Sequence, residues 1–102
     1  MYKIGEMMMI HKFYNLMKKR GFSETLKVLG SFENYEAVQS KFFEKFEESD
    51  SYYNAYLRVK RMLLESDLVK FKLNENNEKV IYLTEKGKKL LTKLEDIEKL
   101  MD

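Results

Sequence analysis

The chain has 102 residues, of which 44% are apolar and 35% are charged, and it contains no cysteine. A chain of this length and apolar content can bury one hydrophobic core, so we expect residues 1–102 to form a single domain. The missing cysteines exclude disulfide bonds and thiolate metal sites. Apolar runs are shorter than the roughly 18 residues of a membrane span and the roughly 7–15 residues of a signal-peptide core, so we expect a soluble, cytoplasmic protein.

Acidic and basic side chains are unevenly distributed, although the formal net charge is only +2. Residues 31–50 contain six acidic and two basic side chains, whereas residues 51–73 contain five basic and two acidic ones. A chain that binds nucleic acid through charge alone would be much more basic. The local excess of positive charge at 51–73 is therefore either a binding surface or an ordinary solvated face.

Helical spacing of apolar residues predicts four helices before residue 66. The first, at about 3–19, has apolar residues on more than one side, which indicates burial on two sides or pairing with another chain. Ser23 is predicted to cap a helix at 24–29, and Asn34 a helix at 35–46. The fourth is expected at about 51–65. Its predicted core face consists of Tyr52, Tyr56, Val59, Met62 and Leu63, and its opposite face of Tyr53, Asn54, Leu57, Arg58 and Arg61.

After Asp67 the apolar spacing changes from helical to alternating. We therefore expect strands at 69–73 and 80–83, joined by a polar turn at 74–78, and then a helix capped by Thr84. Apolar residues of this helix alternate at spacings of four and three, which is typical of a heptad seam. The seam is either a core face or a dimer interface. The helix length favours the dimer, with segments 1–20 and 84–102 as dimerisation helices. The predicted dimerisation residues are Leu90, Leu94, Ile97 and Met101.

These elements predict an α+β fold that is mostly α. The junction residues Val59, Leu63, Leu68 and Val69, and the run Tyr-Leu-Thr-Glu-Lys-Gly at 82–87, carry a family resemblance over about 21–91. The chain resembles winged helix-turn-helix transcriptional regulators of the broad group spanning the MarR-, PadR- and HxlR-like families, and especially small winged-helix regulators of archaea and their viruses. It departs from them at Asp67, where the family usually has glycine, and in a wing tip that lacks arginine.

The resemblance implies a winged helix-turn-helix with a two-stranded wing and extra N- and C-terminal helices. It also implies a homodimer that binds double-stranded DNA sequence-specifically and regulates transcription. The fourth helix would enter the major groove, where arginine pairs with guanine, asparagine with adenine, and hydroxyl groups with phosphate. The expected DNA-binding residues are Ser51, Tyr53, Asn54, Arg58 and Arg61 in this helix and Lys70, Lys72 and Lys79 in the wing. The alternatives are that these residues form ordinary solvated faces and that Ser51 caps the helix.

Two other functions fit the sequence. A winged helix used for protein contacts fits the low net charge and the acidic wing tip. The second is an architectural DNA-binding protein, although the low net charge argues against many phosphate contacts. An enzyme is not expected, because there is no glycine-rich phosphate loop and no Ser-His-Asp set. No cofactor or metal is expected either, since His11, the single histidine, has no acidic or cysteine partner at metal-ligand spacing.

Overall fold

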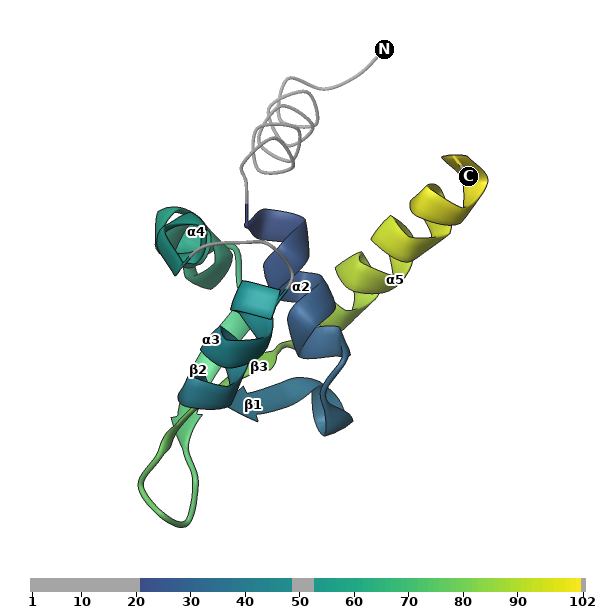
Figure 1. Ribbon diagram of the computed structural model, residues 1–102. Coiled ribbons are helices and arrows are strands. Elements are labelled where there is room, and N and C mark those ends of the chain that lie inside the picture. Colours follow the sequence, from purple (N-terminus) through teal and green to yellow (C-terminus); the bar gives the residue numbers. More distant parts are fainter. Residues whose placement is uncertain (1–20, 49–52, 102) are drawn as a thin grey trace.

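The computed structural model describes residues 21–48 and 53–101, and this part of the chain is α+β and mostly helical (Figure 1). Its elements are α2 (Phe22–Gly30), the 3-10 turn η1 (Glu33–Tyr35), β1 (Glu36–Val38), α3 (Gln39–Glu48), α4 (Tyr53–Glu65), β2 (Val69–Leu73), β3 (Lys79–Leu83) and α5 (Glu85–Met101). Within the described residues, the predicted fourth helix, the hairpin and the last helix are confirmed. The helix predicted at 3–19 lies outside the described residues.

The three strands form an antiparallel sheet in the order β1-β3-β2. Alternate residues of a strand point to opposite faces of the sheet, and Phe71 and Ala37 both pair with Ile81. Ile81, Ala37 and the cross-strand pair Val69–Leu83 belong to the hydrophobic core. One face of the sheet is therefore buried against the helices. In Figure 1 the β2–β3 turn and the C-terminal end of α5 lie at opposite ends of the molecule.

Aromatic rings join α3 to α4. The ring centroid of Tyr56 lies 5.2 Å from that of Phe42, 5.5 Å from that of Phe43 and 6.1 Å from that of Phe46, all in edge-on arrangements. Phe42, Phe46 and Tyr56 are buried. This cluster holds one side of α4 against α3, which leaves the opposite side of α4 facing solvent.

The end of α4 is a Schellman motif that sets the direction of β2. Leu68 N–H donates to Leu63 O at 3.0 Å and Asp67 N–H donates to Leu64 O at 3.1 Å, while Leu63 and Leu68 are both buried. Asp67 occupies the left-handed position of this motif, with φ of 59°. Glycine would take this conformation without a steric penalty, and aspartate adopts it here at a modest cost.

The first turn of α5 packs directly on the backbone of this junction. Thr84 N–H donates to Leu68 O at 3.0 Å, and its hydroxyl donates towards the carbonyls of Asp67 and Leu68. The predicted cap is confirmed, because Gly87 N–H donates to Thr84 Oγ1 at 3.0 Å. A Cβ atom at Gly87 would lie 2.2 Å from Leu68 O. The backbone at Leu68 therefore contacts the first turn of α5 closely enough to require glycine at position 87, three residues after the capping Thr84.

Two boundary predictions are wrong. Ser23 does not cap α2: Gly21 is its N-cap, and Glu24 Oε2 accepts the Gly21 N–H at 2.9 Å. Gly21 also lies so close to α4 that a Cβ atom would approach Ala55 O at 2.7 Å. The helix predicted at 35–46 instead begins at Gln39 and continues to Glu48.

The cause of the second error is a short strand. Asn34 and Tyr35 have positive φ of 58° and 57°, so Asn34 turns the chain rather than capping a helix. Residues 36–38 then pair with β3, with Ala37 opposite Ile81. A three-residue strand is too short to produce an alternating pattern in the sequence, and pairing with β3 is a tertiary contact that spacing cannot predict.

We expect Gly87→Ala to destabilise the protein by about 2 kcal/mol, although helix propensity alone favours alanine by about 1 kcal/mol. The reason is the steric conflict with Leu68 O, which belongs to a backbone held on both sides. Chemical denaturation followed by circular dichroism measures the difference. Gly30→Ala is the matched control, since its Cβ would meet side-chain atoms of Leu91 and no backbone atom, so we expect a smaller loss of stability than for Gly87→Ala. Equal stability of Gly87→Ala and the parent would contradict the packing described.

Candidate nucleic-acid interface

α4 has a buried face and a polar, exposed face. Tyr56, Val59 and Leu63 are at most 1% exposed, as their helical spacing predicts, whereas Met62 is only partly buried. The exposed face presents Asn54, Leu57, Arg58 and Arg61. Tyr53 opens the helix, but its side chain and all of Ser51 lie outside what the structure describes. The described members of the predicted interface on α4 thus share one face.

The two arginines differ in their surroundings. Arg61 Nε donates to Glu65 Oε1 at 2.8 Å, one turn further along α4. This hydrogen bond and the charge of Glu65 raise the pKa of Arg61 above its usual value. The terminal nitrogens of Arg61 remain available to a further acceptor. Arg58 is exposed and forms no ion pair within the described residues.

The hairpin lysines predicted to bind DNA lie on two different faces of the sheet. Lys79 pairs with Leu73 and shares the face of Phe71, which is the face directed at the helices. Lys70 and Lys72 pair with Tyr82 and Val80 on the opposite face. These three cations therefore do not form one continuous patch.

On the helix-directed face, two lysines lie over one aromatic ring. Lys79 Nζ is 4.2 Å from the ring centroid of Phe71, and Lys60 Nζ of α4 is 5.3 Å from it. Both distances are within the range of cation–π attraction. Lys60 was not among the residues expected to bind DNA, because it lies outside the α4 face of Asn54, Arg58 and Arg61. The sheet brings Lys60 and Lys79 together, and so extends the positive charge of α4 onto the hairpin.

On the opposite face, each lysine has an acidic partner. Lys72 Nζ lies 2.8 Å from Glu36 Oε2 and 5.1 Å from the ring centroid of Tyr82, and Lys70 Nζ lies 3.4 Å from Asp67 Oδ1. These residues border a surface cavity of about 380 Å³. Its lining is Asn34, Glu36, Lys70, Lys72, Tyr82, Leu83, Thr84, Glu85 and Lys88. The paired carboxylates leave little net positive charge there.

The hairpin tip is an ordered acidic turn. Asn74 Oδ1 accepts the N–H groups of Asn76 and Glu78, each at 2.9 Å, and Asn77 takes a left-handed φ of 59°. Glu75 and Glu78 are exposed. An acidic turn repels phosphate, so contact with DNA at the hairpin would involve its strands rather than the turn itself.

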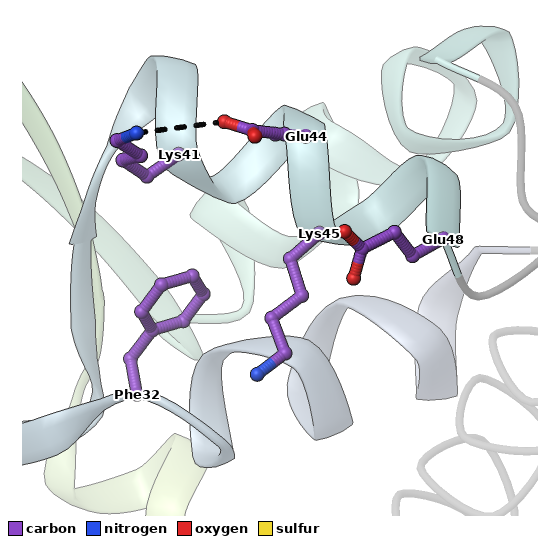
Figure 2. Close-up of a pocket in the computed structure, with 5 residues that line it drawn as sticks. All are labelled: Phe32, Lys41, Glu44, Lys45 and Glu48. Carbon is purple, nitrogen blue, oxygen red and sulfur yellow. Dashed lines mark ion pairs between the residues drawn. The ribbon is translucent and has the colours of Figure 1, made fainter.

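A second surface cavity, of about 210 Å³, lies along α3 (Figure 2). Lys41 pairs with Glu44 at 3.7 Å, and Lys45 Nζ lies 5.3 Å from the ring centroid of Phe32. Glu48 completes the lining. The charges of its two lysines and two glutamates balance, so this cavity does not attract an anion.

The predicted heptad seam of α5 is divided between core and solvent. Leu94 is 3% exposed within the hydrophobic core, and Leu90 packs against that core. Ile97 and Met101 are 53% and 82% exposed. An ion pair between Lys27 and Glu98, at 2.5 Å, also joins α2 to α5 near the C-terminal end of α5. Of the predicted seam, only Ile97 and Met101 are therefore exposed enough to contact a second chain.

No protein-family model, no curated protein and no solved structure matches this chain. In the part of the chain that the structure describes, every helix is too short or too polar to cross a membrane. Among these described residues, no three histidine, aspartate or glutamate side chains lie close enough together to hold a metal ion. A proposal for the function therefore has to rest on the fold and the surface chemistry.

Proposed function

We propose that this chain is a winged helix-turn-helix protein that binds double-stranded DNA as a homodimer and regulates transcription. The order α2, β1, α3, α4, β2, β3 and the sheet order β1-β3-β2 support the winged-helix assignment. In this arrangement α3 and α4 are the helix-turn-helix, α4 is the recognition helix and the hairpin is the wing. The observation that carries the proposal is the exposed face of α4, with Asn54, Arg58 and Arg61 turned away from the core.

The chemistry of this face suits the major groove. Arg58 and Arg61, three residues apart, can each donate two hydrogen bonds to O6 and N7 of guanine, and Asn54 can pair with an adenine edge one turn earlier. The Glu65 carboxylate holds Nε of Arg61, so this side chain would use its terminal nitrogens. Occupying a promoter in this way would be the simplest route to regulation.

The end of α5 supports the homodimer. Ile97, Leu100 and Met101 leave 53%, 84% and 82% of their surface exposed. A two-fold axis through this end of the helix would place two recognition helices on a pseudo-palindrome, with half-sites about 34 Å apart.

The exposed leucines of α4 favour a second candidate function, a winged helix that binds protein. Leu57 and Leu64 are 44% and 38% exposed and lie seven residues apart on the helix. The acidic hairpin tip is compatible with this role. Co-purification of a stable protein partner that is lost in Leu57→Ser, together with no shift of DNA, would favour this candidate over the first.

We expect Arg58→Ala with Arg61→Ala to lower the affinity for the operator at least about 30-fold, because each arginine–guanine pair contributes about 1–3 kcal/mol. Fluorescence anisotropy with the DNA upstream of the protein's own gene measures it. Lys89→Ala with Lys93→Ala is the control, since it removes two exposed positive charges from α5. Unchanged affinity in the arginine variant, or an equal loss in both variants, would remove the proposed role of α4.

We expect Ile97→Lys with Met101→Lys to convert the dimer to a folded monomer, because both side chains are exposed in one chain and buried in the proposed interface. Sedimentation velocity measures the mass, and circular dichroism measures the fold. Glu95→Lys adds a lysine to an exposed position of the same helix and should leave the dimer intact. Leu94 is unsuitable for this test, since it belongs to the core. A parent chain that sediments as a monomer would contradict the dimer.

A further inference from the structure

Lys60 and Lys79 are brought together from two different elements on the helix-directed side of the hairpin. Lys60 belongs to α4 and Lys79 opens β3, and both ammonium groups lie over the ring of Phe71, which β2 supplies. The sheet register puts Lys79 on the face of Phe71 and Ile81. The pair therefore lies between the exposed face of α4 and the hairpin.

Lys60 and Lys79 differ from Lys70 and Lys72 in whether they form ion pairs. Among residues 21–48 and 53–101, Lys60 and Lys79 have no acidic partner, whereas Lys70 and Lys72 pair with Asp67 and Glu36. A phosphate would not have to break an ion pair at Lys60 or Lys79. At Lys70 and Lys72 it would have to displace a carboxylate or be repelled by it.

The Phe71 ring restricts where the two ammonium groups can lie. A lysine side chain is flexible, and holding it in place costs rotamer entropy on binding. Attraction to the negative face of the ring offsets part of this cost before any ligand arrives. The hairpin packs Phe71 against the core, so the position of the ring is itself fixed.

We propose that Lys60 and Lys79 form a pair of binding groups for the DNA phosphate backbone, and that Phe71 is the positioning residue that aligns them. This inference rests on the proposed function and specifies which side of the hairpin contacts DNA. It replaces Lys70 and Lys72, which the sequence predicted for this role, with Lys60 from α4. The contact would lie where β3 leaves the turn, at Lys79, and on the neighbouring side of α4, at Lys60.

The test compares four single variants that each remove one positive charge: Lys60→Ala, Lys79→Ala, Lys70→Ala and Lys72→Ala. The probe is a fluorescein-labelled duplex of mixed sequence, long enough for two half-sites about one turn apart. Anisotropy titrations of the full chain between roughly 50 and 200 mM salt give the slope of log affinity against log salt. We expect Lys60→Ala and Lys79→Ala to reduce this slope by about 0.9 for each phosphate that the variant no longer neutralises. Lys70→Ala and Lys72→Ala should leave it unchanged.

Phe71 is tested separately, because its change must act through the lysines. Phe71→Leu should weaken binding about two- to fivefold, and Phe71→Tyr, which keeps the ring, should restore it. In the Lys60→Ala, Lys79→Ala background, Phe71→Leu should have no further effect. A merely structural role would weaken binding equally in both backgrounds, and circular dichroism checks that each variant is folded.

The outcomes separate this inference from the proposed function. A parent chain that binds no duplex at low salt would defeat the proposed function, and the inference with it. A parent chain that binds DNA, with slopes reduced by Lys70→Ala and Lys72→Ala and not by Lys60→Ala and Lys79→Ala, would defeat the inference alone. Equal reductions in all four variants would also defeat it, since charge rather than position would then control binding.

Discussion

The arrangement of this domain depends on the contact between the carbonyl group of Leu68 and the first turn of α5. This carbonyl accepts the Thr84 N–H at 3.0 Å and lies where a Cβ atom of residue 87 would be. Because Leu68 directly follows the end of α4, this contact ties the start of α5 to α4. The two strands between these positions are thereby closed into a hairpin at a fixed place beside α4. Without this close approach, the base of the hairpin would be free to move relative to the helix.

The position of the hairpin decides the charge pattern of the surface. A strand alternates its side chains between two faces, so a hairpin fixed beside α4 has one face with the lysine of β3 and another with the lysines of β2. The first face is joined to α4 by Lys60, whose ammonium group lies over the Phe71 ring. The second is charge-balanced, because Glu36 and Asp67 pair with its lysines. A protein with little net charge can in this way carry a local cationic surface.

The sequence predicted the elements that have a clear period of their own. The core and solvent faces of α4 follow from 3–4 spacing, and the hairpin follows from the alternation of Val69, Phe71 and Leu73 around lysines. Features set by contacts between distant segments were not predictable. The strand at 36–38 exists because it pairs with β3, and the Gly21 cap of α2 depends on close packing against Ala55. Neither leaves a periodic pattern in the sequence.

The candidate site likewise contains residues that spacing predicts and residues that only tertiary contacts bring together. Asn54, Arg58 and Arg61 share a face because one helix places them there, which spacing alone predicts. The neighbourhood of Lys60 and Lys79 arises from the sheet register and the packing of Phe71, so composition gives no indication of it. The seam of α5 shows the same limit, since a spacing of four and three residues does not distinguish Leu94, which the domain buries itself, from Met101, which it exposes.

The exposed face of α4 is the surface that we propose reads duplex DNA. The most direct test of this proposal is fluorescence anisotropy of the unaltered chain with the DNA upstream of its own gene and with a scrambled duplex, at roughly 50 and 200 mM salt. We expect tighter binding to the upstream DNA, and we expect this binding to weaken as salt rises. Equal affinity for both duplexes, or no binding to either at the lower salt concentration, would contradict the proposal.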